Sequence, residues 1–177
     1  MDSLSLTSAL VEFERHHVRP QPGPTLIVGS KVYGVKEDRR KRYADATGVD
    51  MQAGEGVDLV QNLEDSLPED LLLKFAHVDC MSVLEHCQRP WLVAQSIESM
   101  MLPGASIFVS VPFVWRVHGY PSDYWRMTPD ALPILFPSIR WEKIALCSNV
   151  LDGMKAAKIY GYPYFPRTET AGFGVKV

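Results

Sequence analysis

A chain of 177 residues with 46% hydrophobic and 22% charged residues has the size and composition of a single globular domain, which excludes an intrinsically disordered chain. Its net charge of −3 at pH 7 argues against a protein that binds a polyanion over its whole surface. The three cysteines match no disulfide framework and, together with His86, no zinc-binding spacing, so we expect free thiols, a reducing compartment and no metal site.

The N-terminal residues give no sign of export or of a membrane anchor. They lack the basic segment of a secretory signal peptide and carry acidic residues within their apolar pattern. No apolar run in the chain is long enough to cross a membrane. We therefore expect a cytoplasmic location without a membrane partner.

The first expected element is a helix within residues 1–20. Leu10, Phe13 and His17 recur at helical spacing, which predicts a helix over about 3–17. The segment RPQPGP that follows ends this helix and acts as a short, stiff connector.

Five short segments predict strands, and two of them, 25–29 and 106–111, predict buried strands because they are apolar runs. The five segments lie at 25–29, 46–51, 56–61, the first part of 75–86, and 106–111. Helices or helical turns are indicated at about 36–43, 67–75, 90–101 and 128–136. The segments 140–148 and 172–177 alternate like a closing antiparallel pair of strands.

The alternation of strands with helices predicts one α/β domain over residues 1–177, with a mostly parallel sheet covered on both faces. In open sheets of this kind, ligands bind beyond the carboxyl ends of the strands. Ser30, Asp50, Asn62 and Ser82 each come at or just after the end of a predicted strand. These residues should therefore meet at one edge of the sheet, where a cofactor site is expected.

The basic run Arg39–Arg42 lies in the predicted helical segment after the first strand. We expect it to form a solvated helix face, with contact to phosphate or nucleic acid as the alternative interpretation.

Six segments resemble class I S-adenosylmethionine-dependent methyltransferases, in particular the small group called methyltransferase type 11. In chain order these segments are LIVGS (26–30), TGVDM (47–51), VDLVQNLEDSLPED (57–70), VDCMSVLEHCQRPW (78–91), MMLPGASIFVSVPF (100–113) and HGYPSDYWRMTPDAL (118–132). The resemblance implies a Rossmann-like three-layer sandwich with a seven-stranded, mostly parallel sheet whose last strand is antiparallel. It also implies a methyltransferase with S-adenosyl-L-methionine as its cofactor.

Positions carried over from this resemblance assign the cofactor site. Gly29 and Ser30 would line the methionine part, and Asp50 would accept hydrogen bonds from the ribose hydroxyls. Ser82 would border the sulfonium. A glycine after the first strand also lets a ligand approach the backbone closely, although an ordinary turn residue is the alternative for both Gly29 and Asp50.

The adenine would be held by residues that follow the second and third strands. By the same resemblance, Met51 would pack beside the adenine, and Asn62 and Leu63 would flank it.

The first loop departs from the family pattern, which usually reads acid-x-Gly-x-Gly-x-Gly. Ile27 stands at the acid position and Lys31 at the second glycine position, and the segment runs GSKVYG. This loop must therefore differ in shape, and Lys31 could reach the carboxylate of the cofactor.

The loop after the fifth predicted strand, Pro112 to Met127, is rich in aromatic and charged residues. Methyl transfer needs a positioned acceptor and, for oxygen or nitrogen acceptors, a base. His118 is the candidate base, and Asp123 could orient it or bind substrate. The candidate substrate-binding residues are Trp115, Arg116, Tyr124, Trp125 and Arg126.

A purely structural role for this loop is the alternative. The aromatic side chains could pin the loop to the core, and Asp123 and Arg126 could form a local ion pair. Glu85 and His86 are open to the same two interpretations, because LEH could cap the loop after the fourth strand. The aromatic segment 159–167, within a candidate lid or partner-binding loop at 150–170, is likewise undecided.

The leading hypothesis is methyl transfer to an oxygen or nitrogen atom of a small-molecule or sugar acceptor. The alternative is a catalytically degenerate interaction module with the same fold, favoured by the altered first loop. A nicotinamide-dependent oxidoreductase is disfavoured because G-x-G-x-x-G is missing, and nucleic-acid methylation because no N-P-P-Y-type motif follows the fourth strand. The acceptor itself and the oligomeric state, a homo-oligomer included, stay open.

Overall fold

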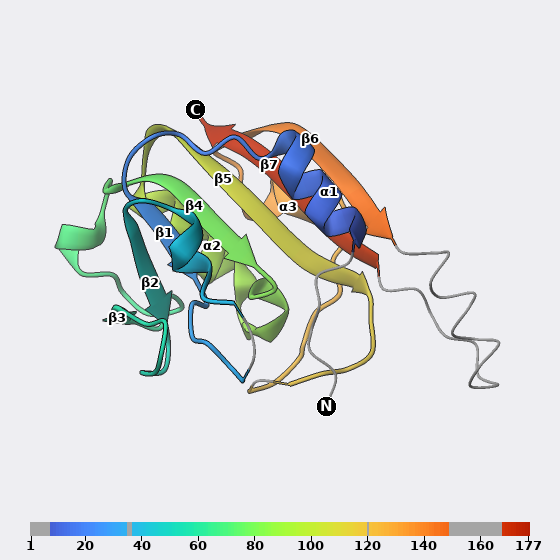
Figure 1. Cartoon of the computed structure of the whole chain (residues 1–177), viewed down its shortest axis with the longest axis horizontal. Coiled ribbons are helices and arrows are strands. Elements are labelled where there is room, and N and C mark those ends of the chain that lie inside the picture. The colour runs from blue at the N-terminus through green and yellow to red at the C-terminus, as the bar shows by residue number, and fades with distance from the viewer. Residues whose placement is uncertain (1–7, 35–36, 120, 149–167) are drawn as a thin grey trace, which may run out of the picture.

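A seven-stranded sheet forms the centre of the protein in the computed structural model, which describes residues 8–34, 37–119, 121–148 and 168–177 (Figure 1). The strand order is β3-β2-β1-β4-β5-β7-β6, and β7 runs antiparallel to both of its neighbours. The bounds are β1 Thr25–Val28, β2 Ala46–Asp50, β3 Leu59–Val60, β4 Phe75–Met81, β5 Met101–Val114, β6 Ile139–Ser148 and β7 Thr168–Lys176. The predicted sheet, with its antiparallel last strand, is confirmed.

Helices cover both faces of this sheet. They are α1 Ser8–His17, α2 Pro90–Met100, α3 Ala131–Leu135, and the 3-10 helices η1 Arg39–Arg42, η2 Glu69–Leu71 and η3 Leu84–His86. In Figure 1, α1 lies in front of β6 and β7, whereas α2 and α3 lie behind the sheet. The predicted three-layer α/β arrangement is therefore confirmed.

Several boundaries differ from the sequence-based expectation: β3 covers only two residues of 56–61, η2 only three of 67–75, and β7 begins at residue 168 and not at 172. The helix expected at 36–43 is only η1, and the one expected at 128–136 is only α3, since Thr128 and Pro129 lie in a turn before it. The sequence predicts a turn at 102–105, between the helix at 90–101 and the strand at 106–111. In the structure these residues belong to β5. A register shift between Phe75 and His77 and a positive φ of 77° at Gly104 allow the strand to continue through them. The candidate lid at 150–170 lies mostly outside the described residues.

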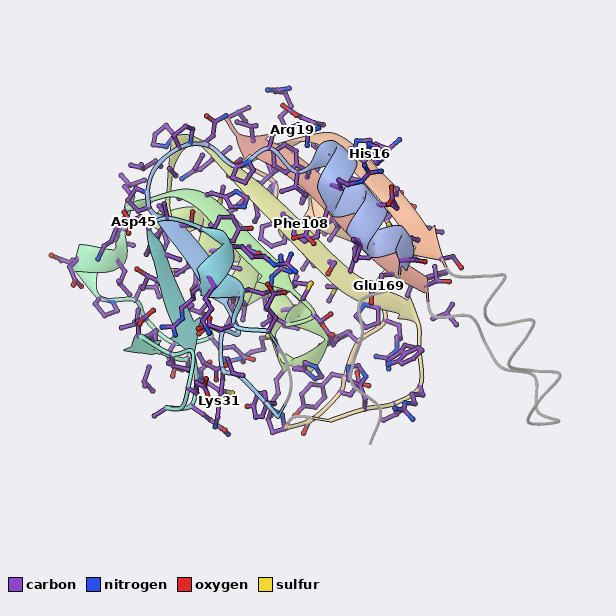
Figure 2. The ribbon with its side chains drawn as sticks, viewed as in Figure 1. His16, Arg19, Lys31, Asp45, Phe108 and Glu169 are labelled. Atoms are coloured by element: carbon purple, nitrogen blue, oxygen red, sulfur yellow. The ribbon has the colours of Figure 1, made fainter. Side chains whose placement is uncertain are left out.

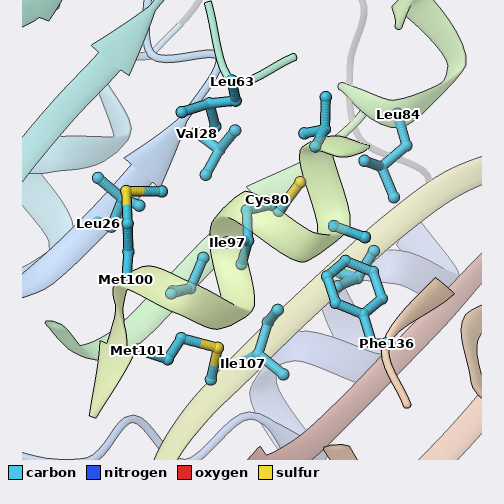
Figure 3. Close-up of a cluster of buried hydrophobic side chains, with 14 of the residues drawn as sticks. Leu26, Val28, Leu63, Cys80, Leu84, Ile97, Met100, Met101, Ile107 and Phe136 are labelled. Carbon is cyan, nitrogen blue, oxygen red and sulfur yellow. The ribbon is translucent and has the colours of Figure 1, made fainter. Parts of the chain in front are cut away.

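Two hydrophobic cores flank the sheet because successive strand residues point to opposite faces. Under α2, Leu26, Cys80 and Ile107 pack with Ile97 and Met100 of the helix (Figure 3). On the other face, under α1, Leu10 and Phe13 pack with Phe108, Ala171 and Phe173. Burial of each large side chain contributes about 1.5–3 kcal/mol, so both helices are held by their apolar faces.

The three arginines of the basic run at η1 form ion pairs within the chain, and the solvated face expected for the run is wrong for Arg39, whose side chain is largely enclosed. Arg39 is only 10% exposed, donates through Nε to Asp79 at 2.9 Å, and contacts Glu14 of α1 at 2.7 Å. Burial alone lowers the pKa of Arg39, but the two carboxylates raise it. Arg40 and Arg42 also bind carboxylates, from Asp38, Asp58, Glu14 and Glu37.

None of the described helices has the length and apolar character that a bilayer crossing needs. Cys80, Cys87 and Cys147 are all free thiols, as the cysteine spacing indicated.

We expect Arg39→Ala to lower the free energy of unfolding by about 3–5 kcal/mol, because it leaves the buried Asp79 carboxylate without its cation. Arg42→Ala is the matched control, and about 1 kcal/mol or less is expected because its pair with Glu37 is partly exposed. Urea unfolding followed by circular dichroism measures both, and equal losses would contradict the assigned role of Arg39.

Candidate cofactor and acceptor site

A cavity of about 780 Å³ lies at the edge of the sheet where the parallel strands end. Its size falls within the range of about 300–1,000 Å³ that is typical of small-molecule sites. Figure 2 places Lys31, one of its lining residues, at this edge, and Asp45 at the opposite edge. The structure brings all seven predicted cofactor residues to the cavity wall: Gly29, Ser30, Asp50, Met51, Asn62, Leu63 and Ser82.

Gly29 occupies a position that only glycine fits well. Its φ is +66°, and an added Cβ would lie 2.6 Å from Cγ2 of Val83. The chain therefore turns sharply after β1 and packs against the loop after β4.

Asp50 ends β2 with its carboxylate at the cavity. One oxygen accepts a hydrogen bond from the backbone N–H of Lys31 at 3.2 Å, and the other accepts one from the backbone N–H of Gln52 at 3.0 Å. An ionised carboxylate offers about four acceptor positions, so both oxygens can still accept hydroxyl groups.

The altered first loop is shaped by glycines that lie elsewhere in the sequence. Val32 donates its backbone N–H to Glu55 at 2.8 Å, which pins the loop to the one after β2. A Cβ on Gly56 would lie 2.5 Å from the carbonyl oxygen of Ser30, and one on Gly48 would lie 2.6 Å from Oγ of Ser30. Sequence analysis missed Gly48 and Gly56, whose role shows only once the two loops are packed together.

The amine of Lys31 is engaged within the protein. Nζ donates to Oε1 of Gln52 at 3.0 Å and lies 5.3 Å from the ring centroid of Tyr33. Lys31 thus helps to join the first two loops at the cavity wall.

Ser82, at the end of β4, has a φ of +54°, which is strained for a residue with a side chain. Its backbone N–H donates to the carbonyl of Ser110 on β5 at 2.8 Å. Strain of this kind is concentrated at functional sites and persists only where the surroundings impose it.

The loop after β5 is fastened to the loop after β4 through hydrogen bonds to backbone carbonyl groups. The carbonyl of Glu85 accepts hydrogen bonds from the backbone N–H groups of Tyr124 and Trp125 at 2.8 and 3.3 Å. Nε1 of Trp125 donates to the carbonyl of Cys87 at 2.8 Å. Nδ1 of His86 lies 2.6 Å from the carbonyl of Ser122. Together these bonds form a clasp between residues 85–87 and 122–125.

Within this arrangement, His118 lies at the cavity wall and contacts Asp123, as predicted. The Asp123 carboxylate accepts from the backbone N–H of His118 at 2.8 Å and lies 3.0 Å from its Nδ1. It also forms a bidentate pair with Arg126. Although burial opposes ionisation, these donors lower the pKa of Asp123 to about 2. Burial lowers the pKa of His118, against the attraction of Asp123.

Glu85 was left undecided by sequence analysis, and the structure places its carboxylate beside two histidines. The side chain is fully buried, and Oε1 lies 3.7 Å from Nε2 of His86 and 3.8 Å from Nε2 of His118. Burial raises the pKa of Glu85 to about 8.

Of the five predicted substrate-binding residues, only Tyr124 lines the cavity. Trp125 belongs to the clasp and packs edge-on against Trp91, and Arg126 binds the carbonyls of Trp115 and Arg116 besides Asp123. Trp125 and Arg126 therefore hold the loop in place, which fits the structural alternative for these two residues, whereas Trp115 and Arg116 do not line the cavity.

We expect Gly29→Ala to lower the free energy of unfolding by about 1–3 kcal/mol more than Gly34→Ala. Both glycines have positive φ, so both substitutions strain the backbone. An added Cβ meets Val83 at Gly29, whereas at Gly34 it meets no atom of the described residues within 4 Å. Chemical denaturation measures the difference, and equal losses would show that the turn after β1 is not tightly packed.

No protein-family model matches the sequence, and no curated protein matches it. The structure is nevertheless similar to solved structures. One is the 1,6-didemethyltoxoflavin-N1-methyltransferase of Burkholderia thailandensis with bound 1,6-didemethyltoxoflavin and S-adenosylhomocysteine, at 14% identity and a TM-score of 0.64 over 96% of this chain and 76% of that one. A second is the [4+2]-cyclase SpnF, at 13% identity and a TM-score of 0.63 over 95% and 79% of the chains.

A third similar structure is the 16S rRNA (adenine(1408)-N(1))-methyltransferase from Catenulisporales acidiphilia with its cosubstrate SAM. It is 17% identical, with a TM-score of 0.55 over 87% of this chain and 85% of that one. At such low identity the likeness shows the fold and not the activity. This chain has the fold of the class I S-adenosylmethionine-dependent methyltransferases.

Proposed function

We propose that this protein binds S-adenosylmethionine and transfers its methyl group to an oxygen or nitrogen atom of a small-molecule or sugar acceptor. The observation that carries the proposal is the convergence of residues from four separate loops, after β1, β2, β3 and β4, on one cavity in a methyltransferase fold. Those residues are the ones assigned to the cofactor from the sequence.

The cavity wall fits the parts of the cofactor in order. Asp50 offers free acceptor positions to the two ribose hydroxyls, and Gly29 lines the cavity where the methionine part would lie. Met51 is 53% exposed beside Asp50 and can cover one side of the adenine, with Asn62 and Leu63 at the other. Ser82 would lie by the sulfonium.

Bound S-adenosylmethionine supplies an electrophilic methyl group, which an acceptor displaces from sulfur in line. His118 can act as the base for the methyl acceptor. Among the described residues, its Nδ1 faces a carboxylate oxygen of Asp123 and the carbonyl of Arg116, which accept hydrogen bonds, so Nδ1 carries the proton of the ring. The lone pair of Nε2 then takes the proton that the acceptor loses as its new bond to carbon forms. Asp123 holds the imidazole in this tautomer.

The pairing of the basic residues with carboxylates of the same chain supports a small-molecule acceptor over a nucleic acid. Arg39, Arg40 and Arg42 are all bound to carboxylates of the same chain, so this run offers little charge to a nucleic-acid backbone. One of the similar structures is named for a small-molecule acceptor and another for ribosomal RNA, and the concave cavity favours the former kind.

We expect saturable binding of S-adenosylmethionine by isothermal titration calorimetry, and Asp50→Asn to weaken it about 10- to 100-fold. This corresponds to the loss of charge-assisted hydrogen bonds worth about 1.5–3 kcal/mol. Asp45→Asn is the matched control, because Asp45 is exposed at the opposite edge of the sheet. If the folded wild-type protein does not bind the cofactor, the interaction-module hypothesis replaces this proposal.

We expect His118→Asn to lower the rate of methyl transfer about 10²- to 10⁴-fold while cofactor affinity changes little, because His118 acts on the acceptor. The rate is measured as labelled methyl incorporated from S-adenosylmethionine into a pool of small hydroxyl and amine compounds. His16→Asn, on the exposed face of α1, is the control. An unchanged rate in His118→Asn would remove His118 from the reaction.

A further inference from the structure

We propose that Glu85, His86 and His118 form a binding site for one divalent transition-metal ion at the cavity wall, with Zn²⁺ as the best-suited ion. One carboxylate and two imidazoles are a common ligand set for zinc, and the same set with open positions also suits iron(II). Residues 85 and 86 follow β4, whereas residue 118 follows β5, so the fold alone brings the three together.

The distances between the three ligand atoms suit one ion. Oε1 of Glu85 lies 3.7 Å from Nε2 of His86 and 3.8 Å from Nε2 of His118, and all three atoms lie within 4.8 Å of one another. Bonds of about 2.0–2.2 Å in a tetrahedral site place neighbouring ligand atoms about 3.4 Å apart. Small side-chain shifts would therefore complete the coordination.

Each histidine is already held in the tautomer that a metal ligand needs. Nδ1 of His86 faces the carbonyl of Ser122 at 2.6 Å, and Nδ1 of His118 faces the carboxylate of Asp123 at 3.0 Å. Since both partners can only accept, each Nδ1 carries its proton, and in the neutral ring Nε2 presents its lone pair to Glu85. A carboxylate or carbonyl behind each histidine is typical of metal sites.

Glu85 supplies the second, independent observation. Its side chain is fully buried, and neither carboxylate oxygen has a hydrogen-bond partner on any other described residue. The nearby Arg126 is already bound in bidentate fashion by Asp123. A carboxylate buried without a partner is costly, and a cation between Glu85 and the histidines would satisfy it.

The position of the metal site at the cavity suggests that the ion activates the methyl acceptor, and this part of the inference rests on the proposed methyl transfer. His86 and His118 line the cavity, whereas Glu85 lies behind them, so the open coordination positions of the ion would face the cavity. An acceptor hydroxyl bound there would lose its proton to water more easily. The ion would thus take over the activation assigned to His118 acting alone, and the acceptor would be an oxygen nucleophile.

The test is a Zn²⁺ titration of the full chain after dialysis against a chelator, followed by calorimetry. We expect saturable binding of one ion per chain that Mg²⁺ does not displace, because Mg²⁺ prefers all-oxygen octahedral sites. Glu85→Gln, which keeps the shape of the side chain, and His118→Asn should each weaken binding by roughly 100-fold. Asp123→Asn, behind His118, should weaken it about 10- to 100-fold.

Two control variants exclude other ligands. His16→Ala removes an exposed histidine that lies beside Glu12 on α1, and Cys87→Ser removes a thiol at the cavity wall. Both should retain the binding. Binding that is lost in either control, or that survives in both Glu85→Gln and His118→Asn, would overturn the proposal.

Folding of each variant is checked by thermal unfolding, and the wild-type protein provides a test that needs no variant. Its Co²⁺ complex should show the absorption of a nitrogen- and oxygen-ligated ion without thiolate charge transfer. No saturable binding by folded wild type would also overturn the site. If the protein binds the cofactor but not the metal ion, only this inference is overturned. If it does not bind the cofactor, the proposed function is overturned.

Discussion

The arrangement of the candidate site depends on the clasp between residues 85–87 and 122–125. The Glu85 carbonyl accepts two backbone hydrogen bonds from Tyr124 and Trp125, so the loop after β5 is fixed over the end of β4. These bonds hold His118 and Asp123 close to Glu85 and His86. Backbone carbonyls accept every bond of this junction, so the carboxylate of Glu85 takes no part in it.

The buried carboxylates of Asp79 and Glu85 differ in whether the chain supplies a cation to pair with them. Asp79 on β4 is bound by Arg39 and Tyr43 and stabilises the face that η1 covers. Glu85, only a few residues further on, has no such cation and faces two imidazoles. Asp79, which stabilises the fold, finds its partners within the chain. Glu85 does not, and a buried carboxylate of this kind beside a cavity is typical of a functional site with an external partner.

The first loop illustrates how two loops can pack closely when the usual glycines of one of them are missing. Lys31 stands where the family usually has glycine, yet the loop still reaches Asp50 through its backbone N–H. The space it needs comes from Gly48 and Gly56 on the neighbouring strand and loop. The requirement is close packing of two loops, and glycine on either side of the contact can meet it.

Local pattern predicted the strands along the chain and the residues at their ends, from Gly29 to Ser82, because periodicity and strand ends are encoded by neighbours in sequence. It offered contact with His118 only as one of two roles for Asp123. The tertiary structure decided that Arg39 is buried, that Trp125 and Arg126 support a loop, and that Glu85, His86 and His118 meet at one point. Those outcomes arise from contacts between segments far apart in the chain, whose partners no local spacing identifies.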